Sequence, residues 1–216
     1  MTPEPSLRGA RDRRIAELEA RIRRSSAVGV RIPVAVTAIL CSAALLVLER
    51  EEAAYFFSSR SPIDLGSEGQ YRLERLESNR YAQLHGTPTV RGAYWRENKG
   101  TFVLVGVLGT PIVVRRKALA GEDWQAGRAP PQPDQRPFAV RGRLLSAQDS
   151  PQYRDALAKL ASLGELTRPP DGLWLFFEGE RPSANFGPVL ASAALLIFLL
   201  VNAALLWQAI AERREA

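Results

Sequence analysis

The chain has 216 residues, 46% of them hydrophobic, and a formal net charge of +6. Its single cysteine, Cys41, and single histidine, His85, exclude an intrachain disulfide and a zinc site made of the usual cysteine and histidine ligands. Residues 1–31 hold eight arginines against four acidic residues, so the positive charge belongs mainly to this segment. We therefore expect no nucleic-acid partner for the rest of the chain. No sequence motif indicates a bound cofactor.

The basic N-terminal segment, residues 1–31, is predicted to be helical over Arg8–Arg24, which is rich in helix-forming residues. Ile15, Leu18 and Ile22 recur at helical spacing and form one narrow apolar stripe. Two interpretations stay open: a helix surrounded by solvent, and a basic amphipathic helix lying on an anionic membrane surface. A short parallel coiled coil is a third interpretation, although three apolar positions are few for one.

Two uninterrupted apolar segments, Ile32–Leu48 and Pro188–Trp207, contain 17 and 20 residues and no charged side chain. As helices they would span about 26 and 30 Å, close to the thickness of the hydrocarbon core of a bilayer. We therefore predict two transmembrane helices in contact with the lipid bilayer. The predicted division is a basic tail (1–31), a first membrane helix with an outer extension (32–57), a mostly-β domain (58–185), a second membrane helix (186–210) and a short tail (211–216).

The charges that flank the two apolar segments predict the orientation in the membrane. The arginine-rich residues 1–31 precede the first segment, whereas the mainly acidic Glu49–Glu52 follows it, and Arg213 and Arg214 follow the second segment. Because positively charged flanks stay in the cytoplasm, we expect both termini to be cytoplasmic and the central domain to be extracytoplasmic. The alternative for the first segment is a cleaved signal peptide, but its long leader and acidic outer flank favour a retained anchor.

Small and polar residues inside the two apolar segments predict that the helices pack against each other, because helices in lipid associate through such residues. Ala38 and Ser42 lie on one face of the first segment, and Asn202 is a polar residue at membrane depth in the second. Helix rise places Asn202 level with the region around Thr37 in an antiparallel partner, so we predict a hydrogen bond between these positions. The alternative is that Asn202 faces another protein or its own backbone.

Turn-forming residues divide the central domain into short strands and one helix. The first membrane helix is expected to continue over Glu49–Ser59, Gly109–Pro111 is typical of a hairpin turn, and Ser150 is a suitable N-cap for a helix over Pro151–Leu163. The predicted strands are Gln70–Leu76, Tyr81–Val90, Thr101–Leu108, Pro111–Arg116, Pro137–Leu145 and Leu173–Phe177. This order indicates two transmembrane α-helices flanking an α+β, mostly β domain. We expect a small curved sheet or a barrel like that of the oligonucleotide/oligosaccharide-binding (OB) fold, with one helix.

The central domain contains none of the motifs G-x-S-x-G, H-E-x-x-H, G-x-x-x-x-G-K-[ST] and C-x-x-C. His85 stands in a predicted strand without a partner motif. The carboxyl pairs Glu122–Asp123 and Glu178–Glu180 have no predicted cleft around them. These features favour a non-enzymatic protein over an enzyme.

Two groups of residues are candidates for contact with a partner or a membrane. Arg115, Arg116 and Lys117 stand together at a strand end and could bind an anionic headgroup or an acidic partner, or be an ordinary charged strand end. Trp95 and Trp124 lie in loop-like surroundings. Exposed loop tryptophans can enter a membrane interface or anchor a partner, and they can equally fold back onto a sheet.

Local patterns add a resemblance to a known family. Tyr81–Gly86 (YAQLHG) is similar to a V-x-L-x-G strand, Phe138–Leu144 (FAVRGRL) to a V-x-V-x-G-x-L strand, and Ile112–Arg116 (IVVRR) to an apolar strand ending in arginine. With the layout of helix, outer domain and return helix, they resemble the surfeit-locus family of cytochrome oxidase assembly factors. The Gly-Trp after that arginine and the Trp-Gln beyond the first membrane helix are missing. The resemblance implies a non-enzymatic assembly role for a respiratory complex, with haem handling as one route, although the lone His85 provides no haem-ligand pattern.

The leading hypothesis is a non-enzymatic, two-span membrane protein whose outer β domain binds or scaffolds a protein partner in the membrane or envelope. An assembly factor for a respiratory complex is one version of it, and a homo-oligomer is compatible with the sequence. The alternatives are a membrane-bound enzyme acting on lipid or cell-wall substrates, and a membrane sensor. The short tails disfavour a sensor, because they are too short for a folded output domain.

Overall fold

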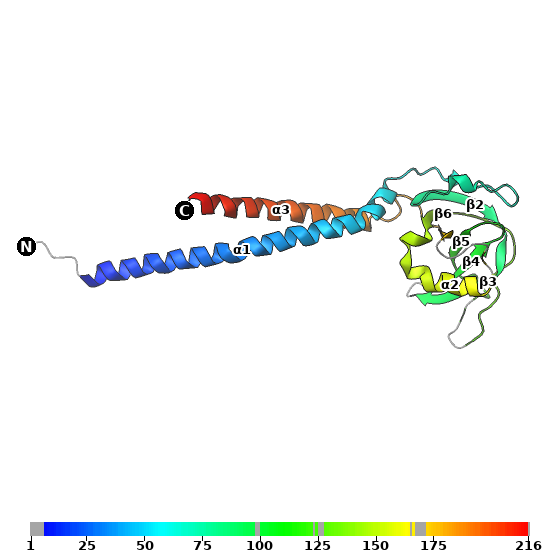
Figure 1. The fold of residues 1–216 in the computed structure, drawn as a ribbon, viewed down its shortest axis with the longest axis horizontal. Coiled ribbons are helices and arrows are strands. Elements are labelled where there is room, and N and C mark those ends of the chain that lie inside the picture. Colours follow the sequence, from blue (N-terminus) through cyan, green and yellow to red (C-terminus); the bar gives the residue numbers. More distant parts are fainter. Residues whose placement is uncertain are drawn as a thin grey trace, which may run out of the picture. The chain divides into compact units, whose positions relative to one another are not determined.

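The structure is a computed structural model that describes residues 7–97, 100–122, 124, 128–164, 166 and 172–215. Figure 1 shows its elements in chain order. It divides into two compact units, which we describe separately: the chain up to Arg50 with the chain from Gly187 onward, and Glu51–Phe186. The helices are α1 (Leu7–Phe56), α2 (Arg154–Ser162) and α3 (Gly187–Glu215), with 3-10 turns η1 (Leu73–Arg75), η2 (Ala147–Asp149) and η3 (Pro151–Tyr153). The strands are β1 (Ile63–Asp64), β2 (Arg80–Gly86), β3 (Pro88–Glu97), β4 (Gly100–Val107), β5 (Ile112–Lys117), β6 (Phe138–Ser146) and β7 (Trp174–Glu178).

Two helical segments are long and apolar enough to cross a membrane: Ile32–Phe56 of α1 and Gly187–Ala211 of α3, with mean hydropathies of 2.2 and 2.6. Only 11% and 0% of their most apolar windows are buried, so their apolar side chains are not covered as in the core helix of a soluble protein. Helix α1 is continuous over 50 residues and includes Pro33, so the predicted tail helix and the first apolar segment form one element.

Small residues are the buried ones in the apolar parts of α1 and α3. Ala35 and Ser42 in α1 are 6% and 2% exposed, and Ala209 in α3 is 7% exposed. The Ser42 hydroxyl donates to the Ala38 carbonyl at 2.7 Å, which satisfies it inside its own helix. Of the two α1 residues expected to mediate helix packing, Ser42 is buried and Ala38 is half-buried.

Asn202 does not form the predicted hydrogen bond with the first membrane helix. Its side-chain amide donates to the Phe198 carbonyl one turn earlier in α3, at 2.8 Å, and Thr37 is exposed. The prediction is wrong because it considered depth in the membrane alone. A polar side chain in a helix can also be satisfied by the carbonyl four residues earlier.

The central unit is built on a seven-stranded mixed sheet with the order β1-β2-β6-β7-β5-β4-β3. The predicted hairpin is confirmed by the antiparallel pairing of β4 with β5, and β7 lies between β6 (antiparallel) and β5 (parallel). The sheet is not closed into a barrel by strand pairing, so the expected OB-like barrel is not established. Strands β2 and β3, from opposite parts of the strand order, are nevertheless separated only by Thr87.

Four local predictions for the central unit are wrong. The expected strand at Gln70–Leu76 contains the single 3-10 turn η1, and the expected strand at Tyr81–Val90 is two strands, β2 and β3. Trp95 therefore lies in β3 rather than in a loop. Ser150 does not cap the following helix: its hydroxyl is buried without a hydrogen-bond partner among the described residues, and the helix opens with η3.

Apolar side chains pack on both faces of the sheet. One cluster lies on one side of the sheet and includes Leu84, Val105, Val114 and Phe176, which are all 0% exposed. The second cluster lies between the other face and α2: Leu104, Val113, Leu157, Leu160, Leu173, Leu175 and Phe177. The central strands are buried on both faces because each face has its own cover, which explains the uninterrupted apolar run of β4.

The outer end of α1 belongs to the sheet unit and is held there by Arg143 of β6. The Arg143 side chain is 6% exposed and donates to both carboxylate oxygens of Glu52 at 2.8 Å. Its Nε donates to Asn79 at 2.9 Å, and its guanidinium lies 4.4 Å from the ring centre of Tyr55. The Tyr55 hydroxyl in turn donates to the Glu180 carbonyl. The alternating pattern of β6 places Arg143 on the face opposite Val140 and Leu144, with the exposed Arg141, so no local signal in the sequence indicated this anchor.

Candidate binding groove

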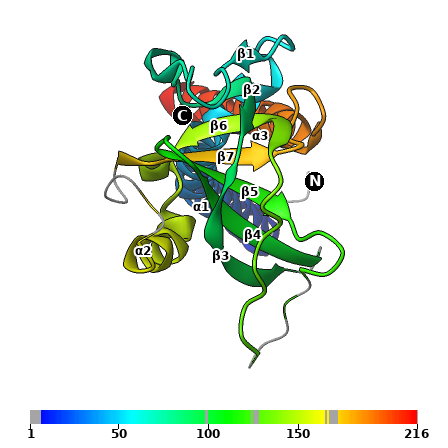
Figure 2. The ribbon, with the colours of Figure 1, turned by 90° about the vertical axis from the view of Figure 1, so that its right-hand side faces the viewer.

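A groove of about 970 Å³ follows strand β3 of the sheet unit. One wall is formed by α2 and the residues just before it, and the other by described residues between β5 and β6: Trp124, Arg128, Pro130, Pro131 and Gln132. In Figure 2, β3, β4 and β5 lie side by side and β3 is the outermost of the three. The lining residues are mainly aromatic or apolar, with charges at the rim: Val90, Arg91, Gly92, Ala93, Tyr94, Trp95, Glu97, Trp124, Arg128, Pro130, Pro131, Gln132, Gln152, Tyr153, Asp155, Ala156, Lys159 and Leu163.

Both tryptophans singled out in the sequence line this groove. Trp95 comes from β3, stacks on Phe102 at 6.1 Å between ring centres, and meets Tyr153 edge-on at 5.7 Å. Trp124 comes from the other wall, and its indole nitrogen donates to the Arg128 carbonyl at 2.9 Å. Both side chains are half-buried, so part of each ring faces the groove. The structure thus brings together two residues 29 positions apart in the sequence.

Arg115 lies beneath Trp95 and is surrounded by aromatic rings. Its guanidinium carbon is 4.1 Å from the ring centre of Phe102 and 5.6–6.0 Å from those of Phe177, Trp95 and Tyr153. The Glu97 carboxylate accepts hydrogen bonds from Arg115 at 3.1 and 3.2 Å and from the Trp95 indole at 2.7 Å. These contacts fix the orientation of Trp95, because cation–π attraction and the shared carboxylate act on the same ring.

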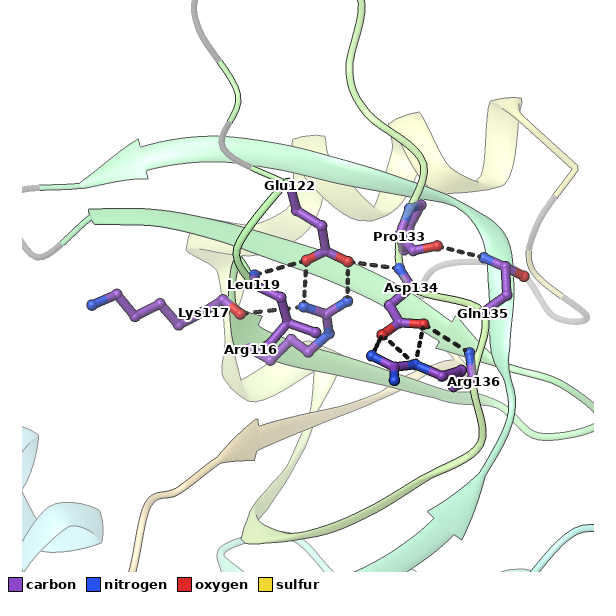
Figure 3. Close-up of polar contacts among 8 residues, drawn as sticks. All are labelled: Arg116, Lys117, Leu119, Glu122, Pro133, Asp134, Gln135 and Arg136. Atoms are coloured by element: carbon purple, nitrogen blue, oxygen red, sulfur yellow. Dashed lines mark hydrogen bonds and ion pairs between the residues drawn. The ribbon is translucent and has the colours of Figure 1, made fainter.

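Arg116 and Glu122 hold the second wall of the groove in place (Figure 3). The Arg116 guanidinium donates two hydrogen bonds to the Glu122 carboxylate, at 2.6 and 2.7 Å, and the two side chains are only 10% and 6% exposed. The same carboxylate accepts the backbone N–H groups of Leu119 and Asp134, at 2.9 and 2.6 Å. One buried carboxylate therefore joins the beginning and the end of the segment that carries Trp124.

The segment end is fixed a second time at Asp134. Its carboxylate accepts hydrogen bonds from the Arg136 side chain at 2.6–3.1 Å and from the Arg136 backbone N–H at 3.1 Å. These hydrogen bonds lower the pKa of Asp134 to about 2. In strand β3, burial raises the pKa of Tyr94 to about 12. Both groups therefore keep their ordinary charge states, ionised for Asp134 and neutral for Tyr94, across the physiological pH range.

The Glu122 carboxylate makes the stability of the sheet unit depend on acidic pH. Burial alone would raise its pKa, but the hydrogen bonds from Arg116, Leu119 and Asp134 outweigh burial and lower the pKa below the ordinary 4.5. A depressed folded-state pKa stabilises the fold above the unfolded-state pKa, and this contribution is lost as pH falls through the folded-state pKa. We expect the difference in free energy of unfolding between the wild-type protein and Glu122→Gln to be largest at pH 7. It should shrink below about pH 4.5 in urea titrations. A difference that stays constant down to pH 3 would contradict this assignment.

The three cations Arg115, Arg116 and Lys117 do not form one exposed patch. The Arg115 side chain is 16% exposed and paired with Glu97, Arg116 is paired with Glu122, and Lys117 alone is exposed. Successive side chains of a strand point to opposite faces, so the two arginines separate onto different faces of β5. In the groove, Arg115 orients Trp95, and Arg116 holds Glu122 at the wall that carries Trp124.

His85 lies outside the groove. It is exposed and lines a separate polar pocket of about 340 Å³ with Asp64, Ser67, Arg72 and Gln83, among others. Within the described chain, no hydrogen bond joins His85 to Ser67 or to Asp64, the contacts that a nucleophile and its base would need. The Asp64 carboxylate is occupied instead by the Gly66 backbone N–H at 3.1 Å and by Arg72 at 3.4 Å.

The two carboxyl pairs noted in the sequence lie in different surroundings. Glu122 serves the structural contact described above, and Asp123 lies outside the described residues. Glu178 and Glu180 are on the exposed end of β7 and the turn after it. Among the described residues, no group of three or more histidine, cysteine, aspartate or glutamate side chains could hold a metal ion.

Comparison of the chain with known protein families, with curated proteins and with solved structures finds no match. The resemblance to the surfeit-locus family therefore stays an expectation from the sequence. The candidate binding site lies in the sheet unit. In that unit the groove along β3 joins the two predicted contact tryptophans to a set of residues that the sequence did not indicate, chiefly Glu97, Tyr153 and Arg128.

Proposed function

We propose that this protein is a non-enzymatic, membrane-anchored binding protein whose sheet domain holds a protein partner in the groove along β3. The observation that carries the proposal is the groove: two half-buried tryptophans, 29 positions apart in sequence, face one apolar cavity and have fixed orientations. Such rigid aromatic anchors in a concave, mostly apolar site are typical of binding sites. The flanking charges support cytoplasmic termini and an extracytoplasmic sheet domain.

We further propose that the sheet domain is a variant of the OB-like barrel. The support is the chain path: β2 and β3 form one nearly continuous extended segment that pairs with β6 at one end and with β4 at the other. A partly open barrel of this kind commonly binds ligands on its outer surface. The groove lies outside the core cluster of Leu84, Val114 and Phe176, which agrees with such a use.

Cross-linking from the groove tests the proposed function. A photoreactive amino acid in place of Gln152, an exposed residue of the groove wall, should give a discrete protein adduct in native membranes. Trp95→Ala should reduce the yield of this adduct about tenfold or more, because loss of a central aromatic anchor typically costs 2 kcal/mol or more. Yield is measured by immunoblot against the full-length chain.

Two controls make the result specific. The same photoreactive group at the exposed Lys117, which is outside the groove, should give no such adduct. Lys159→Glu, on the exposed side of α2, provides a groove variant that leaves the aromatic contacts of Trp95 in place. If neither Trp95→Ala nor Lys159→Glu weakens the adduct from Gln152, the groove is refuted as the binding site. Because the sequence resembles the surfeit-locus family of assembly factors, a respiratory complex is the first partner to look for in the adduct.

A further inference from the structure

The groove runs along the edge of β3 rather than over one face of the strand. Successive strand residues point to opposite faces, so a groove over one face would contact every second residue. Here six consecutive residues, Val90 to Trp95, all line the groove. Ala93 and Trp95 face the cluster under α2, whereas Gly92 faces the opposite side, where a Cβ atom would meet Pro133 at 3.1 Å. The groove therefore lies between the two faces, at the backbone edge.

This backbone edge has no strand beside it. β3 is the last strand of the sheet order and pairs only with β4, from Gly92 opposite Val105 to Glu97 opposite Gly100. Backbone groups of an antiparallel strand point alternately toward and away from the partner, and those of Ala93 and Trp95 face β4. In the described part of the chain, no hydrogen bond engages the outward N–H and C=O of Tyr94, which lies between them. An unpaired strand edge is a template for another extended chain, and proteins usually shield it. Here α2 and the segment around Trp124 form walls on its two sides and leave the edge open between them.

Charge indicates what kind of chain fits. Glu97 is paired with Arg115, and Arg128 and Lys159 line the groove together with the single carboxylate of Asp155. The surplus is positive at the rim, and the lining between is apolar and aromatic. A strand that enters the groove would place alternate side chains against Trp95 and Trp124. Acidic side chains would meet Arg128 and Lys159.

We propose that the groove binds an extended, acidic peptide segment of a partner protein, which adds to the sheet as a strand antiparallel or parallel to β3. This inference rests on the proposed binding function and specifies its mode: backbone hydrogen bonds at the β3 edge supply affinity, while Trp95, Trp124 and the basic rim select side chains. A helix or a lipid chain cannot use the outward N–H and C=O groups of the strand in this way.

Peptide selection with backbone methylation tests strand addition. The full-length protein in lipid nanodiscs is used to select from a displayed library of random twelve-residue peptides. Selected peptides should combine acidic residues with alternating apolar ones. Each is then synthesised with N-methyl groups on alternate residues, in the two possible registers. We expect one register to lose about tenfold or more in affinity and the other to bind nearly as before, because only one set of N–H groups faces β3.

Charge-reversed variants test the basic rim in the same assay. Arg128→Glu combined with Lys159→Glu should weaken the acidic peptides at least tenfold and select basic peptides instead, whereas the exposed Lys117→Glu outside the groove should change neither. Absence of enriched peptides, equal sensitivity of both methylation registers, or selection of helical peptides would each overturn strand addition. Dimerisation of the chain through two β3 edges, seen as a concentration-dependent mass, would overturn the assignment of a foreign peptide.

The two proposals fail in different ways. If cross-linking from Gln152 depends on Trp95 but the peptides bind equally in both methylated registers, the groove is a binding site of another mode. If the cross-link is absent while methylation affects only one register, the edge is competent for strand addition but is not the site used in native membranes.

Discussion

Gly142→Ala is expected to destabilise the sheet domain by about 3 kcal/mol or more. A Cβ atom at this position would lie 2.0 Å from the carbonyl oxygen of Phe177, 2.7 Å from its carbonyl carbon and 3.0 Å from the ring of Phe176. Two of these neighbours are backbone atoms, and the ring belongs to a side chain that is 0% exposed. Strand β6 is paired on both sides, with β2 and β7, so it cannot move away from the clash. Forcing extra volume into such a site costs 1–3 kcal/mol and occasionally more.

The free energy of unfolding, measured by urea titration of tryptophan fluorescence on the full-length protein in detergent, checks this expectation. The matched control is Arg141→Ala, the neighbouring exposed position of the same strand, which should change stability by less than about 0.5 kcal/mol. A Gly142→Ala protein within about 1 kcal/mol of the wild type would show that β6 and β7 are farther apart than described here. Gly142 is also the glycine of the FAVRGRL pattern, and close approach of neighbouring backbone explains why a glycine is needed there.

Glu122→Ala is expected to destabilise the domain by about 3–5 kcal/mol, the usual cost of removing one partner of a buried ion pair. The change leaves the Arg116 guanidinium, 10% exposed, without its carboxylate and removes the acceptor for the N–H groups of Leu119 and Asp134. Because these contacts hold the wall that carries Trp124, the change should also weaken binding in the groove. Both effects have one physical origin, an uncompensated buried charge.

A double-mutant cycle separates the charge from the packing. Arg116→Met with Glu122→Ala removes both charges, so the double variant should be more stable than Glu122→Ala alone. The control is Glu74→Ala, an exposed acid in η1, which should have little effect. Additive losses in the double variant would mean that the ion pair is not coupled. Urea titration at pH 7 provides the free energies, and affinity for a groove-selected peptide provides the effect on binding.

The sequence determined the elements whose signal is local. Two apolar runs without a charge become helices of membrane-spanning length, since length and hydropathy depend on no distant contact. The apolar run Thr101–Leu108, its glycine boundaries and Gly109–Pro111 predicted β4 and its hairpin with β5. Trp95 and Trp124 were singled out from the sequence, but the surroundings of Trp95 were taken for a loop, whereas this residue lies in β3.

Only the tertiary structure decided which of these residues act together. Arg115 and Arg116 are adjacent in sequence, yet strand pleating sends one into an aromatic cluster and the other to Glu122. The groove exists because β3 ends the sheet order while α2 and the Trp124 segment, both distant in sequence, rise on either side of its edge. Strand order depends on pairings between residues far apart in the chain, and no local pattern encodes them. The sequence by itself therefore determined a mostly β domain between two helices long and apolar enough to cross a membrane, and the fold decided where the open edge of the sheet lies.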